Sequence, residues 1–298
     1  MTVTEDYPSR ALGDAPRADE GYYGPKSVSW RVFSDPGSGL GAQVALFLQM
    51  LDPGMMTHFE RVTLTNEGPE VMNARFQRTS AYLRDAVFAD KAHADAAAAH
   101  VDMLHERSTW TDPKTGHVET AKTASWQQWT WWTYIWAAIR GYQEYGPDVL
   151  TTADADRLVV EQQHGAEQLK VPGPFPQSFA ELDAYIKGEM ASKALVYPAA
   201  LAAASLRKPA VKGALQRWGA RKLIDGMVYL MPEEARLFFG MESRTQRQLE
   251  SGRSWTKRIA KLSRGNKSAE QLIATVVGES EKHPYQKVRQ RAKSSATA

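Results

Sequence analysis

The chain has 298 residues, of which 43% are hydrophobic and 24% charged, so it is long enough to bury a core and too apolar to be mostly disordered. Its net charge of +3 is small, which argues against a protein devoted to nucleic acid. The chain has no cysteine, which excludes disulfides, thiolate metal ligands and cysteine nucleophiles. Any metal must therefore be held by histidine, carboxylate or weaker ligands.

Residues 1–25 are rich in Asp, Glu, Arg, Pro and Gly without periodicity, and we expect them to form an extended or poorly ordered arm. They contain no apolar segment typical of a secretory signal or a membrane anchor, so a cytoplasmic location is predicted. The most apolar run, 125–142, carries too many Gln, Thr and Arg side chains to span a bilayer and is predicted to be a buried helix.

Helical patterns begin after residue 26. The glycines of segment 35–43 lack the context of a phosphate loop and are expected to permit a turn and close helix packing. An apolar helix over 40–51 ends before Pro53, because the residue preceding a proline is pushed out of the α region. Two long helices, 70–90 and the alanine-rich 91–110, precede a turn over 111–117.

Later helices are marked by their first residues. Thr151 or Thr152 precedes an acidic first turn, Ser178 and Glu181 have the spacing of a capping box, and Pro232 stands near the first position of a helix. No alternating strand pattern and no internal repeat is found. The predicted fold is all-α, with one large helical domain over 26–265.

The end of the chain is basic, with eleven Lys or Arg against three Glu from residue 252 onward. Trp255, Ile259 and Leu262 form an apolar stripe between cations. A surface helix docked on the core is the favoured interpretation, and weak peripheral contact with an anionic membrane is the alternative. Residues 266–298 are expected to form a basic C-terminal helix and tail.

Three groups of residues could carry chemistry. Arg75, Arg78 and Thr79 project from one face of the 70–90 helix, although a charged face toward water is the ordinary explanation. The histidines show neither an HExxH motif nor i, i+4 spacing. At most one of His93, His100 and His105 could therefore serve as a lone axial ligand. Trp129, Trp132 and Trp136 share a helical face, which favours core packing over a cofactor wall.

Four segments, taken in order, resemble one family. They are an entry segment over 24–53, an Arg-x-x-Arg-Thr helix over 75–90, a histidine-bearing helix and TDP-x-TG turn over 100–121, and the YQEYG and ADADR segments within 142–163. Their order and spacing resemble the MpaB-like and latex-clearing (rubber oxygenase) family from about residue 24 to 241.

The resemblance implies an all-helical fold, globin-like in the broad sense, that encloses a b-type heme and supports oxygen-dependent chemistry, including cleavage of carbon–carbon double bonds. The proximal iron ligand of the family maps onto His105, and its helical Arg and Thr map onto Arg75 and Thr79. Latex-clearing relatives have a lysine able to ligate iron where this chain has Arg78. A guanidinium stays protonated and has no lone pair to give, so water or nothing is expected opposite His105.

The resemblance also assigns expected roles. Arg78 is expected to donate hydrogen bonds to bound oxygen or a heme propionate, Arg75 to meet a propionate or a buried network, and Thr79 to lie near the distal face. The side chains expected to line the cavity are Tyr82, Trp129 and Trp132. Two positions depart from the family pattern, where histidine is usual: Asp52 and Trp131. The indole suggests a drier, more aromatic pocket.

The expected function is that of a heme b-dependent oxygenase or peroxygenase-like oxidoreductase. Its substrate would be small and apolar or aromatic, its oxidant O2 or peroxide, and its setting specialised metabolism. Two alternatives remain: a non-catalytic heme-binding or ligand-binding helical protein, and a cofactor-free interaction protein.

Overall fold

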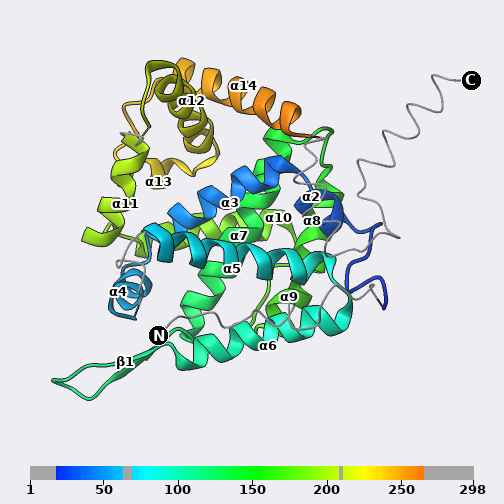
Figure 1. Ribbon diagram of the computed structural model, residues 1–298, viewed down its shortest axis with the longest axis vertical. Coiled ribbons are helices and arrows are strands. Elements are labelled where there is room, and N and C mark those ends of the chain that lie inside the picture. Colours follow the sequence, from blue (N-terminus) through cyan, green and yellow to red (C-terminus); the bar gives the residue numbers. More distant parts are fainter. Residues whose placement is uncertain (1–17, 63–68, 208–210, 265–298) are drawn as a thin grey trace, which may run out of the picture.

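The computed structural model describes residues 18–62, 69–207 and 211–264, and in these ranges it is mainly helical, as predicted (Figure 1). The expected basic tail over 266–298 lies outside the described residues. The helices are α2 (Val28–Phe33), α3 (Pro36–Gln49), α4 (Pro53–Val62), α5 (Pro69–Phe88), α6 (Lys91–Arg107), α7 (Ala124–Tyr145), α8 (Thr152–Glu161), α9 (Gln163–Gln168), α10 (Phe179–Glu189), the short 3-10 helix η2 (Met190–Ser192), α11 (Tyr197–Arg207), α12 (Ala214–Leu230), α13 (Glu233–Phe238) and α14 (Gln246–Ser263).

One β-hairpin interrupts the helices, although no strand was predicted. β1 (Thr109–Thr111) pairs antiparallel with β2 (Val118–Thr120), and the hairpin extends away from the helices in Figure 1. The predicted turn over 111–117 closes it, and the Asp112 carboxylate accepts a hydrogen bond from the Lys114 amide at 2.8 Å. Strands of three residues are too short to leave an alternating pattern, which explains the wrong prediction.

Helix α7 forms the centre of the core, and α3 packs along it in the antiparallel sense. A Cβ on Gly41 of α3 would lie 2.0 Å from the carbonyl oxygen of Ala137, and one on Gly141 would lie 2.4 Å from the carbonyl oxygen of Gly37. The glycines therefore serve close helix packing, as predicted. Buried residues of α7 include Trp129, Trp131, Trp132, Ile135, Trp136, Ile139, Tyr142 and Tyr145.

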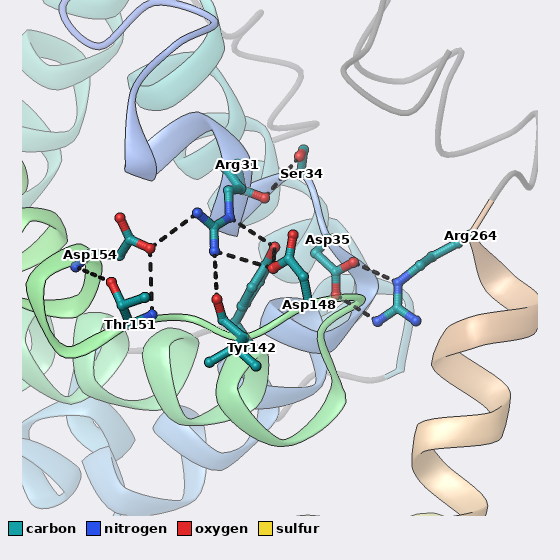
Figure 2. Close-up of polar contacts among 9 residues, drawn as sticks. Arg31, Ser34, Asp35, Tyr142, Asp148, Thr151, Asp154 and Arg264 are labelled. Carbon is teal, nitrogen blue, oxygen red and sulfur yellow. Dashed lines mark hydrogen bonds and ion pairs between the residues drawn. The ribbon is translucent and has the colours of Figure 1, made fainter. Parts of the chain in front are cut away.

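A polar cluster around Arg31 joins α2 to the turn between α7 and α8 (Figure 2). The guanidinium donates to the hydroxyl of Tyr142 at 3.1 Å and to the carboxylates of Asp148 and Asp154 at 3.1 and 3.2 Å. Asp154 also completes a capping box with Thr151, which confirms the predicted start of α8. These acidic residues of the 142–163 segment therefore have a structural role.

The end of α14 returns to the core through Arg264. Its guanidinium donates to the carboxylate of Asp35 at 2.7 Å and to the carbonyl oxygen of Tyr145, as Figure 2 shows for the carboxylate. Asp35 in turn caps α3. Because Trp255 and Ile259 are half-buried, α14 is docked on the rest of the domain, which is the favoured sequence interpretation.

Candidate active site

The antiparallel helices α5 and α6 hold the residues singled out in the sequence. Asp90 lies between the two helices and caps α6 by accepting a hydrogen bond from the His93 amide at 3.0 Å. Burial opposes ionisation of Asp90, but hydrogen bonds from the Ala18 amide and from His93 outweigh it and lower its pKa. The N-terminal segment that includes Ala18 therefore packs against the start of α6.

His105 lies in the last turn of α6, and its side chain is half-buried. Its Nδ1 is buried and has no hydrogen-bond partner among the described residues. Burial lowers the pKa of His105, Arg75 and Lys122 lower it further, and the nearby charge of Asp102 opposes them. The imidazole is therefore neutral at pH 7, which is the form that binds a metal.

Arg75 lies on the neighbouring helix α5 and packs on Phe59. Its guanidinium carbon lies 4.4 Å from the ring centre of Phe59 on α4, a cation–π contact. The side chain keeps solvent-accessible surface, yet desolvation by the surrounding protein and repulsion from Arg78 lower the pKa of Arg75. Arg75 lowers the pKa of His105, so its positive charge acts on the imidazole across the space between α5 and α6.

The face of α5 that carries the predicted residues becomes buried toward the C-terminal end of the helix. Arg75, Arg78 and Thr79 are exposed, whereas Tyr82, one turn further, is only 5% exposed. The Tyr82 hydroxyl has no hydrogen-bond partner among the described residues. Burial raises its pKa, as do Tyr23 and Tyr134, so this hydroxyl stays protonated and points into the interior.

The two tryptophans predicted as cavity walls are both fully buried in α7. Trp129 donates to the carbonyl oxygen of Leu48 at 3.1 Å, and Trp132 packs on Phe175 with 5.8 Å between ring centres. The Trp132 indole nitrogen has no partner among the described residues. Within the described residues, neither indole has a hydrogen bond, ion pair or ring contact with His105.

The buried Lys193 contacts both Trp129 and Asp52. The Lys193 ammonium lies 4.4 Å from the Trp129 ring centre and pairs with Asp52 at 3.1 Å and Glu189 at 3.0 Å. Asp52 also accepts a hydrogen bond from the Met55 amide at the start of α4. The departure at position 52 therefore forms a buried ion pair between the start of α4 and the end of η2.

The second departure, Trp131, is also held by packing. Its indole donates to the carbonyl oxygen of Gln162 at 3.1 Å. A Cβ on Gly165 would lie 2.6 Å from its six-membered ring, so only glycine leaves room for the indole there. Trp131 therefore fastens α7 to α8 and α9.

An ion-pair cluster that was not predicted supports the end of α6. Asp102, one turn before His105, pairs with Lys122 at 2.7 Å and Lys170 at 2.5 Å. Burial raises the pKa of Asp102, but the two ammonium groups outweigh burial and lower it. The i, i+3 spacing of Asp102 and His105 was visible in the sequence, whereas the two lysines come from distant segments.

Two pockets lie near these helices. One of about 350 Å³ follows the side of α6 at Asp95, Asp102 and Lys170, and one of about 300 Å³ lies at Tyr22 and His164. Among the described residues, no three His, Asp or Glu side chains form a metal-ion group. A heme iron needs only one protein ligand, and the neutral His105 beside the cationic Arg75 has the donor chemistry for iron and a propionate.

A comparison with models of protein families identifies the family of this chain. The model for "ER-bound oxygenase mpaB/B'/Rubber oxygenase, catalytic domain" matches residues 30–264. The chain belongs to this family. The match covers most of the residues that the structure describes, so this mpaB and rubber oxygenase member is an oxygenase-type domain. Comparisons with curated proteins and with solved structures found no significant match.

The family domain is all-α here, and none of its described helices is long and apolar enough to cross a membrane. Its histidine-bearing helix α6 and its Arg-x-x-Arg-Thr helix α5 are packed side by side. Arg75 on α5 is close enough to affect the pKa of His105 on α6. Tyr82, Trp129 and Trp132 lie in the core, where Trp129 bonds to Leu48 and Trp132 packs on Phe175.

Proposed function

We propose that this mpaB and rubber oxygenase family member is a heme b-dependent oxygenase, with iron held by His105. The observation that carries the proposal is the state of that side chain, a neutral imidazole with a buried nitrogen that lacks a hydrogen-bond partner. A buried polar atom without a partner is costly, and a bound group would account for it.

Heme, when bound, supplies the redox chemistry that activates O2 or peroxide. The protein contributes binding and charge. Arg75 would pair with a propionate, because its guanidinium is a permanent cation whose charge already acts on His105. Arg78 cannot ligate iron, and with Thr79 it supplies hydrogen-bond donors on the same exposed face of α5.

The proposed substrate is small and apolar or aromatic. Tyr82 and Trp132 support this choice, because both place large aromatic rings in the interior of the domain. Trp129 belongs to the same core wall but already has both Leu48 and Lys193 as partners. A setting in specialised metabolism and a cytoplasmic location are part of the proposal.

Oxygen uptake tests the catalytic part of this proposal. The heme-reconstituted protein should consume O2 or peroxide in the presence of apolar alkenes or aromatic substrates, and His105→Ala should lose this activity. Heme binding without turnover across such a panel would favour the non-catalytic heme-binding alternative. A protein that binds no heme would favour the cofactor-free alternative.

A further inference from the structure

Helices α12 and α14 form a closely packed pair at the top of Figure 1. A Cβ on Gly226 would lie 2.1 Å from the hydroxyl oxygen of Thr256, so the helices touch through small residues. Trp218 of α12 packs edge-on against Trp255 of α14 with 4.7 Å between ring centres. Close packing of α12 and α14 therefore fixes the positions of the side chains on their outer surface.

Large apolar side chains remain uncovered on this pair. Leu215 is 78% exposed, Leu262 is 79% exposed and Trp218 is 46% exposed. Leu215 lies one turn before Trp218 on α12, and Leu262 lies two turns after Trp255 on α14. The stripe expected from the sequence is only partly available, because Trp255 and Ile259 are half-buried.

The same two helices also carry exposed cations. Within the described ranges, five of these exposed cations form no ion pair with a carboxylate. They are Arg217, Arg221, Lys257, Arg258 and Lys261. The two helices carry two carboxylates against these five cations: Asp225, which is buried beside Arg244, and the exposed Glu250. We call these five cations with Leu215, Trp218 and Leu262 the α12–α14 basic face.

We propose that the α12–α14 basic face docks on an anionic membrane surface. Exposed Leu and Trp side chains insert into the interfacial region of a bilayer, and the Lys and Arg side chains around them are attracted to anionic headgroups. No described helix can span a membrane, so the attachment would be peripheral. Membrane contact would also place the enzyme beside apolar compounds dissolved in the bilayer.

Other partners fit this face less well. A second copy of the chain would bring the same cations together and repel. Nucleic acid would satisfy the cations but would leave Leu215 and Leu262 without an apolar partner. An anionic lipid surface satisfies both groups at once, and binding to it does not require heme.

Vesicle co-sedimentation of the full chain tests the proposal. The protein should pellet with phosphatidylcholine vesicles that contain phosphatidylserine and should stay in solution with phosphatidylcholine alone. Combining Lys257→Gln, Arg258→Gln and Lys261→Gln should weaken binding about tenfold or more, and Leu215→Ser with Leu262→Ser should weaken it several-fold. High salt should reduce binding, because it screens the headgroup attraction.

The matched control is Val149→Ser with Lys114→Gln, which removes an exposed apolar side chain and an exposed cation from elsewhere on the surface. It should bind as the parent does, and equal melting temperatures should show that every variant is folded. Failure of the parent to pellet with anionic vesicles, or unchanged binding by both face variants, would overturn the proposal. So would duplex DNA binding without vesicle binding, or a dimer that the leucine substitutions abolish.

Discussion

Arg75 and His105, from neighbouring helices, interact electrostatically, and the guanidinium lowers the pKa of the imidazole. Asp102, on the same helix as His105, acts in the opposite direction. The histidine proposed to bind iron is therefore kept neutral mainly by burial, with charges of both signs close to it.

The first prediction concerns this balance in the heme-free protein. Arg75→Ala should raise the pKa of His105, because a positive charge that acts on it is removed, and Asp102→Asn should lower it. Titration of the imidazole by NMR measures both. Shifts of the same sign in the two variants would contradict the placement of these charges.

The same pKa gives a pH dependence of stability. Because the folded-state pKa of His105 lies below its unfolded value of about 6.5, the folded state binds fewer protons in acid. The contribution of His105 is fully present above pH 6.5 and is lost as the pH falls through the folded-state pKa. Unfolding in urea at several pH values should show a smaller acid-side loss for His105→Ala than for the parent.

The third prediction tests the close contact of α3 and α7. Gly41→Ala should lower the free energy of unfolding by about 3 kcal/mol, because the new methyl group would overlap the Ala137 carbonyl. Gly39→Ala in the same helix meets no atom within 4 Å and should raise it by about 0.5 kcal/mol. Equal effects of the two substitutions in denaturant unfolding would contradict the packing.

The fourth prediction concerns the buried lysine. Lys193→Met should cost about 3 kcal/mol of unfolding free energy, because Asp52 would remain buried without its cation. Lys187→Met, which removes the exposed pair with Asp183, should change it by less than about 0.5 kcal/mol. If Asp52→Asn combined with Lys193→Met costs as much as the two single changes added together, the side chains are not coupled.

Much of the fold could be predicted from local patterns. Helix caps at Thr151 and Ser178, and the glycines of α3, are signals within a few residues, and the structure confirms them. The capping box expected from Ser178 and Glu181 is only half formed, because the Glu181 carboxylate accepts a hydrogen bond from the Gln177 amide instead. The partners of Asp52 and Trp131 could not be predicted, because Lys193 and Gly165 are distant in sequence and ordinary in composition. The hairpin was missed because its strands are too short to show a period.

The candidate site was predictable only in part. The family motifs selected His105 and Arg75, which lie on the neighbouring helices α6 and α5 and interact electrostatically. The helical spacing of Trp129 and Trp132 with Trp136 could indicate a shared face but could not show that Leu48 and Phe175 cover it. Phe59 and Lys122 were not predicted, because neither belongs to a motif.

Arg78 offers a prediction about coordination. In the heme-loaded protein, Arg78→Lys replaces a permanent cation with an amine that can lose its proton and bind iron. The visible spectrum should change toward that of iron with two strong axial ligands as the pH is raised, whereas the parent should show no such change. Arg84→Lys is the matched control from the same helix. Identical spectra for Arg78→Lys and Arg84→Lys would place residue 78 away from the iron.

The most direct test of the central claim is a hemin titration followed by absorption spectroscopy of the parent, His105→Ala and His117→Ala, where His117 is an exposed histidine in the hairpin turn. The parent and His117→Ala should show the same Soret band at one heme per chain, and His105→Ala should lose or strongly shift it. No Soret band in the parent, or the same band in all three proteins, would contradict His105 as the ligand of a bound heme.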